Sequence, residues 1–112
     1  MRKVIVSLAP VRAGDAVDAN ALAEDVKKSV DAGAAMCHLH CRKPDGNLTA
    51  DISYMEECFE AILKKTDVVV QASTGGVSDL TIEERCNPLN YEKVESASLN
   101  GGSTNLGEAV YR

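Results

Sequence analysis

Short apolar runs alternate with amphipathic segments along most of the chain, and this alternation limits the possible folds more than any other feature. Apolar runs of this length are typical of strands buried on both faces of a parallel sheet. The amphipathic segments repeat apolar residues every three or four positions, as helices that cover a sheet do. The sequence predicts strands at residues 4–9, 34–40, 67–72 and 96–100, separated by helices at residues 21–31 and 53–65 and by a short helix after residue 81.

The helix boundaries carry local signals of their own. Residues 53–56 (Ser-Tyr-Met-Glu) and residues 81–84 (Thr-Ile-Glu-Glu) match the capping box, in which a hydroxyl and a glutamate bind the free N–H groups at a helix start. Gly33 follows the first helix and Pro88 ends the third. The second helix is expected to bury an apolar stripe made of Met55, Cys58, Phe59, Ile62 and Leu63.

The order βαβαβαβ leads to a parallel sheet with right-handed connections, which is either an open doubly wound sheet or a closed barrel. The chain lacks the G-x-G-x-x-G pattern after its first strand that dinucleotide-binding open sheets use. Polar side chains instead follow the carboxyl ends of several strands, where barrel enzymes assemble their sites. They are His38, His40, Ser73, Thr74, Ser98 and Asn100. The sequence therefore predicts an α/β fold of the TIM-barrel type.

The length sets the extent of that barrel. A complete (β/α)8 barrel takes roughly 250 residues, and the chain has 112. We therefore expect residues 1–112 to form a partial TIM-barrel domain, the N-terminal half with the first four parallel strands, and the remainder of the barrel to be absent. Four strands leave an open edge, so we expect a homo-oligomer or a complementing chain that completes the barrel.

Charge and composition narrow the class of partner. The formal net charge is −5 and lysine and arginine form no cluster, which argues against nucleic acid and anionic membrane surfaces. No apolar run approaches the roughly 20 residues needed to cross a bilayer. The four cysteines are too sparse for a disulfide scaffold. We expect a cytoplasmic protein with reduced thiols and a small-molecule partner.

His38 and His40 are the first candidates for chemistry. Side chains alternate along a strand, so residues i and i+2 project from one face, about 6.5 to 7 Å apart. Both imidazoles can therefore reach one metal ion, and zinc is the metal that two histidines and a carboxylate commonly bind in catalytic sites. The alternative is a pair of structural histidines bound to the backbone, which the shared face makes the weaker hypothesis. Cys37, Leu39 and Cys41 point to the opposite face and are expected to be buried without binding the metal.

Two loops and one arginine leave alternatives open. Residues 73–76 (Ser-Thr-Gly-Gly) could form an anion-binding nest for a carboxylate or phosphate, or only a turn that needs glycine. Residues 100–105 form a similar polar, glycine-rich exit from the fourth strand. Arg42 could hold an anion or brace its loop through a carboxylate, and the nearby Asp45 and Asp51 favour bracing.

The combined pattern H-x-H-x-R at residues 38–42, Q-x-S-T-G-G at 71–76 and A-S-L-N at 97–100 resembles the β-keto acid cleavage enzymes. The resemblance runs from the first predicted strand to the last residue. It implies a zinc-dependent TIM barrel that condenses a β-keto acid with acetyl-CoA and releases acetoacetate and a new acyl-CoA. It also implies that His38 and His40 bind the metal, with substrate-binding residues among Ser73, Gly75, Gly76, Ser98 and Asn100.

The resemblance also indicates what is missing or altered. In the family, a glutamate that completes the metal ligands and an arginine and aspartate that set up deprotonation come from later strands, beyond Arg112. We therefore expect catalysis to be incomplete in this chain, and the alternative is a truncated or split remnant that acts as a non-catalytic binding or assembly module. The type member holds its substrate's amino group with a glutamate, where this chain has Gly14 beside Asp15. A neutral or acidic substrate side chain is therefore expected to be preferred over an aminated one, and the alternative is that Asp15 takes over the role of that glutamate.

Overall fold

The computed structural model describes residues 1–75, 79–99, 104–106 and 109–111. Its main sheet has four strands in the order β1-β2-β3-β4, which are Ser7–Leu8, Met36–Leu39, Val69–Ala72 and Ser96–Ala97. The helices between them are α1 (Ala19–Asp31), α2 (Ser53–Leu63) and α3 (Ile82–Cys86), the last followed by a 3-10 helix, Asn87–Asn90. An antiparallel pair, β5 (Thr104–Leu106) and β6 (Ala109–Tyr111), follows the main sheet.

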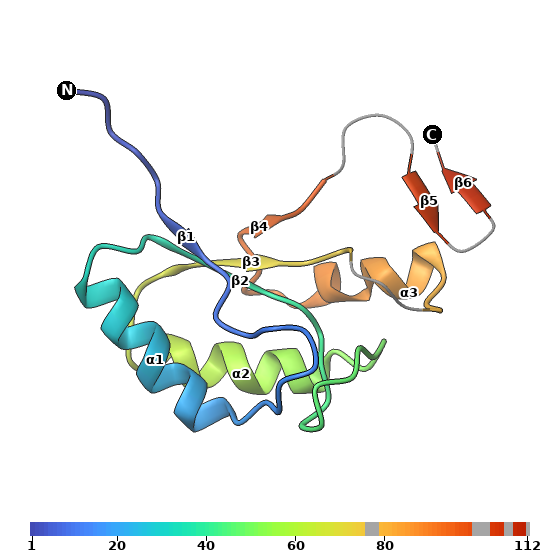
Figure 1. The fold of residues 1–112 in the computed structure, drawn as a ribbon, viewed down its shortest axis with the longest axis horizontal. Helices are drawn as coiled ribbons and strands as arrows, with labels where there is room; N and C mark the ends of the chain where they lie inside the picture. Colours follow the sequence, from blue (N-terminus) through green and yellow to red (C-terminus); the bar gives the residue numbers. More distant parts are fainter. Residues whose placement is uncertain (76–78, 100–103, 107–108, 112) are drawn as a thin grey trace.

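All neighbouring strands of the main sheet are parallel, and each lies beside the next in chain order (Figure 1). A helix follows each of the first three strands. This is the arrangement with which a (β/α)8 barrel begins, and it confirms the predicted order of elements. Among the described residues, no helix is both long and apolar enough to span a membrane.

The core lies between the sheet and the two long helices, which cover the same side of it (Figure 1). Side chains of β2 and β3 alternate between buried positions on this covered face and half-buried positions on the opposite, open face. The covered face presents Cys37, Leu39, Val70 and Ala72. Four residues of the predicted stripe on α2 are buried against them, and Leu63 is half-buried. The alternation therefore leaves His38 and Gln71 on the open face.

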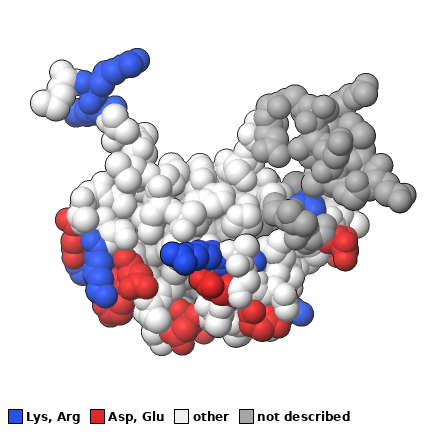
Figure 2. All heavy atoms as spheres, viewed as in Figure 1, with Lys and Arg blue, Asp and Glu red and all other residues white. Residues whose placement is uncertain are grey.

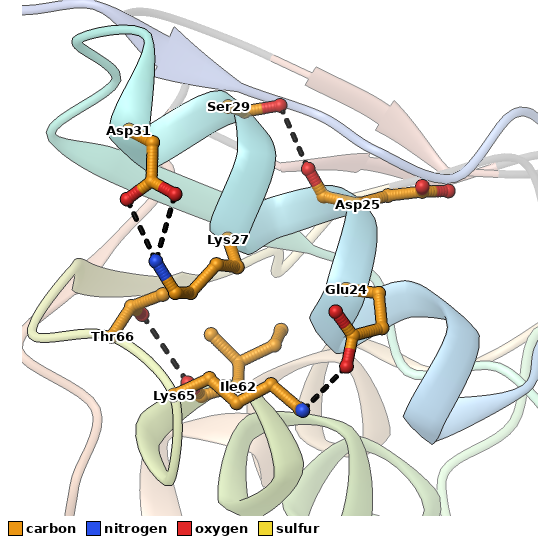
Figure 3. A network of polar contacts seen from close by, with 8 residues as sticks. All are labelled: Glu24, Asp25, Lys27, Ser29, Asp31, Ile62, Lys65 and Thr66. Carbon is orange, nitrogen blue, oxygen red and sulfur yellow. Dashed lines mark hydrogen bonds and ion pairs between the residues drawn. The ribbon is translucent and has the colours of Figure 1, made fainter.

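Charged side chains contribute little to this packing. Figure 2 shows them gathered over the helical side of the molecule, whereas the sheet region is almost free of them. Among the contacts drawn in Figure 3, one joins α1 to the end of α2, where Lys65 Nζ lies 2.5 Å from Glu24 Oε1, and the others lie within one segment. Lys65 and Glu24 are 39% and 57% exposed, and ion pairs at that exposure contribute only about 0–1 kcal/mol. Apolar burial therefore joins the helices to the sheet.

One of the two predicted capping boxes is present. At α3, Thr81 Oγ1 accepts from the Glu84 N–H at 3.2 Å, and the Glu84 carboxylate accepts from the Thr81 N–H at 2.8 Å. The prediction at α2 is wrong, because Ser53 is the first helical residue and the preceding Ile52 offers no side-chain cap. The Asp51 carboxylate instead accepts from the Ser53 N–H at 3.1 Å and from its hydroxyl at 2.7 Å. An ionised carboxylate two residues upstream is the stronger acceptor.

Several other boundaries differ from the prediction, among them that of the fourth strand, which is Ser96–Ala97 where residues 96–100 were predicted. α1 begins two residues earlier than expected, because the Asp18 carboxylate caps it by accepting from the Ala21 N–H at 2.7 Å. The third helix ends at Cys86, before Pro88 as predicted, and the chain continues through Pro88 as a 3-10 turn. The first strand is limited to β1, whereas Val4 and Ile5 are 80% and 73% exposed. β1 lies at the edge of the sheet, so among the described residues it has a strand partner on one side only.

Candidate metal centre

His38 and His40 lie at the carboxyl end of β2, on the open face of the sheet. Their ring centroids are 5.2 Å apart and the ring planes are 82° apart, so the edge of one ring faces the other. Both line a cavity of about 430 Å³. Its other residues come from the loop after β1 and the turn after β2: Ala9, Val11, Ala13, Gly14, Leu39, Arg42, Gly46, Asn47 and Leu48. The predicted pair is thus brought to one cavity.

A side-chain hydrogen bond occupies one nitrogen of His38. Its Nδ1 lies 2.8 Å from Gln71 Oε1, and the Gln71 amide donates from Nε2 to Ser96 Oγ at 3.0 Å. Because an amide oxygen only accepts, His38 Nδ1 carries the proton and Nε2 carries the lone pair. Gln71 and Ser96 were missed in the sequence. Each is a polar residue on the open face of an otherwise apolar strand, and that was the available signal.

His40 offers a second nitrogen in a different way. Its Nδ1 is buried and has no hydrogen-bond partner within the described part of the chain. Burial lowers the pKa of His40, and the nearby His38 and Arg42 lower it further, whereas the Gly75 backbone acts in the opposite direction. A buried nitrogen without a partner is costly unless a ligand occupies it. The two histidines together therefore fit the needs of a divalent metal, which binds neutral imidazole nitrogens.

The neighbouring thiols do not take part in this arrangement. Burial raises the pKa of Cys37 to about 12 and that of Cys41 to about 11, so both are protonated at neutral pH. Both are buried on the covered face, and Cys41 donates from Sγ to the Asp51 carbonyl at 2.9 Å. Among the described residues no three His, Cys, Asp or Glu side chains come close enough to hold a metal. The described part of the chain therefore offers two ligands.

The structure describes three of the five predicted substrate-binding residues, Ser73, Gly75 and Ser98. The loop after β3 is tied to the end of β4, because the Thr74 N–H donates to Ser98 Oγ at 3.2 Å and Thr74 Oγ1 donates to the Ser98 carbonyl at 2.9 Å. Gly75 reaches His40 through its backbone. Ser73 is buried and accepts from the Gly75 N–H at 3.2 Å, so its hydroxyl shapes the turn.

Ser73 and Gly75 line a separate cavity of about 20 Å³, near α3, and they are not among the described residues around the histidine cavity. Gly76 and Asn100, the two remaining candidates, lie outside the described residues. The structure thus brings Gly75 to the histidines and Ser98 to Thr74.

Arg42 braces its loop, as predicted, but the predicted carboxylate contact is wrong. Its Nη1 donates to the Gly46 carbonyl at 2.6 Å. Asp45 is occupied locally, because it accepts from the Asn47 N–H at 2.9 Å, and Asp51 caps α2. The Arg42 Nε is buried and has no hydrogen-bond partner among the described residues. The guanidinium therefore adds positive charge to the wall of the histidine cavity.

Gly46 brings the loop after β1 onto the same turn. Its φ is +88°, a conformation that favours glycine, and a Cβ at this position would lie 2.3 Å from the Asp15 carbonyl oxygen. The Val17 N–H also donates to the Pro44 carbonyl at 2.9 Å. Since Gly14 and Gly46 both line the histidine cavity, this close contact fixes one of its walls.

Comparisons with known proteins identify the family of this chain. The family model described as beta-keto acid cleavage enzyme matches residues 17–112. A 3-keto-5-aminohexanoate cleavage enzyme of Acetoanaerobium sticklandii is 39% identical over 77% of this chain and 32% of its own length, and a protein of the same name from Fusobacterium nucleatum gives the same figures. A 3,5-dioxohexanoate:acetyl-CoA acetone transferase of Paraburkholderia graminis is 35% identical over 95% of this chain and 37% of its own length. The chain thus spans about a third of these relatives, and it belongs to the beta-keto acid cleavage enzyme family.

Proposed function

We propose that this chain supplies two metal ligands of a zinc-dependent enzyme that cleaves a short β-keto acid, with acetyl-CoA as co-substrate and acetoacetate and a new acyl-CoA as products. The observation that carries the proposal is that His38 and His40 line one cavity, with His38 Nδ1 hydrogen-bonded to Gln71 and His40 Nδ1 buried without a partner among the described residues. The names of the relatives support the reaction class, since one is a 3-keto-5-aminohexanoate cleavage enzyme and another a 3,5-dioxohexanoate:acetyl-CoA acetone transferase.

Zinc bound at these nitrogens would polarise the keto oxygen and stabilise the negative charge that develops as the carbon–carbon bond breaks. His38 and His40 would hold the ion at the carboxyl end of β2, beside the cavity that both residues line. Two protein ligands leave positions for a substrate oxygen and for groups outside the described residues. Arg42 adds positive charge beside the cavity, which favours an anionic substrate.

The proposed role of the loop after β3 is to position the substrate carboxylate. Thr74 and Ser98 lock this loop to the end of β4, and the Gly75 backbone lies against His40. Ser73 supports the turn through its hydroxyl. Gly76 and Asn100 continue these two segments and complete the proposed set. Loss of such a positioning contact weakens binding and also misplaces the reacting carbon.

The wall around Gly14 supports a substrate without an amino group. Gly14 lines the histidine cavity and offers neither charge nor side chain. The neighbouring Asp15 is exposed and lines a different cavity, beside α1, so its carboxylate does not replace the family's amine-binding glutamate. We therefore expect a β-keto acid with a neutral or acidic side chain to be preferred over an aminated one.

Zinc binding can be tested on the chain itself. Titration calorimetry of the metal-free chain with Zn²⁺ is expected to show one site, and the His38→Ala, His40→Ala double variant is expected to lose it. Asn87→Ala is a control, because it removes a half-buried polar side chain that is not among the residues lining the histidine cavity. Equal zinc binding by the chain and the double variant would refute the site.

A second candidate function is a binding or assembly module without catalysis. It is favoured by the two-ligand site and by the exposed apolar residues Val4, Ile5 and Val6 before β1, which lack cover among the described residues. Co-expression with the remaining two thirds of a relative decides between the two functions. If the two parts copurify, turnover of a panel of β-keto acids with zinc and acetyl-CoA supports the enzyme. A stable complex without turnover supports the module.

A further inference from the structure

The geometry points to Gln71 as a positioning residue, which fixes the tautomer of His38 so that its Nε2 presents a free lone pair to the cavity. This inference rests on the proposed metal site. Gln71 lies directly opposite His38 in the register of β2 and β3, and both side chains are half-buried on the open face. The contact between His38 Nδ1 and Gln71 Oε1 is 2.8 Å, a normal hydrogen-bond length.

Gln71 is the middle member of a row across three strands at one register. It lies opposite His38 in β2 and opposite Ser96 in β4. Its amide has two unlike ends, an oxygen that accepts from His38 and an NH₂ that donates to Ser96 Oγ at 3.0 Å. The bond to Ser96 therefore favours the amide orientation in which the oxygen faces the histidine. Sheet pairing holds all three side chains in place.

The tautomer matters because a neutral imidazole has only one lone pair on its nitrogens. With the proton on Nε2, His38 would direct an N–H at the metal position. A hydrogen bond at the other ring nitrogen decides where the proton sits, and loss of such a partner typically costs 10–100-fold in metal affinity. Gln71 achieves this with a neutral group, so it adds no negative charge beside the ring.

The two histidines have different partners, so the inference predicts an effect on only one of them. His38 is held by the side chain of Gln71, whereas His40 meets the backbone of Gly75. A change at Gln71 should therefore alter the tautomer of His38 and leave that of His40 unchanged. A general loss of packing would affect both rings.

The first test reads the tautomer directly in the metal-free chain, by long-range ¹H–¹⁵N correlation spectra of the imidazole rings. In the unaltered chain His38 is expected to carry its proton on Nδ1. In Gln71→Met, which keeps the side-chain length but removes the acceptor, the proton is expected to move to Nε2. In Gln71→Glu, which keeps an acceptor, it is expected to stay. A proton on Nε2 in the unaltered chain would overturn the inference without any variant.

The second test measures zinc affinity by competition with a chromophoric chelator. Gln71→Met is expected to weaken binding roughly 10–100-fold, Ser96→Ala less, and Gln71→Glu little. Asn87→Leu is the control, because Asn87 is a half-buried amide whose Nδ2 donates to the Ala50 carbonyl at 3.2 Å, away from the histidines. A loss in Gln71→Met no larger than in this control would overturn the inference.

If Gln71→Met does not fold, the Ser96→Ala variant provides the test in its place. An unchanged His38 tautomer together with an unchanged zinc affinity in that variant would count against the positioning role of Gln71. Failure of the proposed function gives a different result, because the unaltered chain would then bind no zinc. The tautomer measurement uses the metal-free chain, so it would still show whether Gln71 fixes the proton on His38 Nδ1.

Discussion

The two faces of the sheet depend on different interactions, apolar packing on the covered face and hydrogen bonds on the open face. On the covered face, Phe59, Ile62 and Val70 are fully buried and need no particular partner atom. On the open face, His38 and Gln71 are half-buried and share a hydrogen bond, and Gln71 makes a second one to Ser96, while His40 keeps a nitrogen without any partner among the described residues. Stability should therefore reside on the covered face and metal chemistry on the open one. The predictions below test that division, from the largest expected effect to the smallest.

The division predicts a large stability loss from truncation on the covered face. Phe59→Ala removes a fully buried ring that stacks on Tyr91 at a centroid distance of 6.1 Å, and it should cost about 3–5 kcal/mol of unfolding free energy. Urea denaturation followed by circular dichroism measures it. His38→Ala, on the open face, is the control and should cost less than about 1 kcal/mol. Similar losses for both variants would contradict the division.

A second prediction concerns the loops at the open face. Gly46→Ala should destabilise the chain by roughly 1–3 kcal/mol, because the new Cβ meets the Asp15 carbonyl oxygen and the backbone is held at φ +88°. Gly14→Ala is a matched control, since Gly14 has φ +86° but open space around a Cβ. Gly14→Ala should therefore cost only the free energy of holding an alanine at a positive φ. Thermal unfolding of both variants measures the difference, and equal losses would show that the close contact is unimportant.

The pH dependence provides a third, smaller effect. Burial lowers the pKa of His40 below the ordinary value near 6.5, so the unfolded chain takes up a proton first as the pH falls. The folded state should therefore lose stability from about pH 6.5 down to the lowered pKa. Urea midpoints between about pH 7.5 and about pH 5.5 measure it, with His40→Gln as the reference. If the His40→Gln variant loses as much stability over this pH range as the unaltered chain does, His40 is not the cause.

The smallest effect is expected on the outer surface of the helices. Lys65→Met removes the ion pair with Glu24, which is more than a third exposed on both sides. It should change the unfolding free energy by no more than about 0.5 kcal/mol, and less in high salt. Denaturation at two salt concentrations checks this. A larger, salt-sensitive loss would mean that surface charge takes part in joining α1 to the end of α2.

Local sequence patterns predicted the parts of this structure that depend on neighbours in the chain. The alternation of faces in β2 follows from strand geometry alone, so the positions of Cys37 and His38 could be predicted. The capping box at Thr81 is equally local, because both partners lie within four residues. The cap of α2 was mistaken because two local acceptors compete there, and the Asp51 carboxylate binds the Ser53 N–H that the predicted capping box assigned to Glu56.

The features that escaped prediction depend on distant pairing. Gln71 lies 33 residues from His38 and 25 from Ser96, so the row exists only once the strand register is set. The length of β1 depends in the same way on what flanks the edge of the sheet, and the apolar character of Val4 and Ile5 does not reveal it. Arg42 had two plausible carboxylates nearby, but the turn presents the Gly46 carbonyl instead.

The contact between Gly46 and Asp15 also has a consequence for how new specificities could be engineered. The two loops belong to different strands and lie about thirty positions apart, yet they meet with no space for even a methyl group. An insertion or a bulky residue near Gly14 would push on the turn that Arg42 holds, and so on the end of β2 that carries both histidines. Libraries aimed at the substrate side chain should therefore vary residues 13–15 together with residues 45–47, as a single unit.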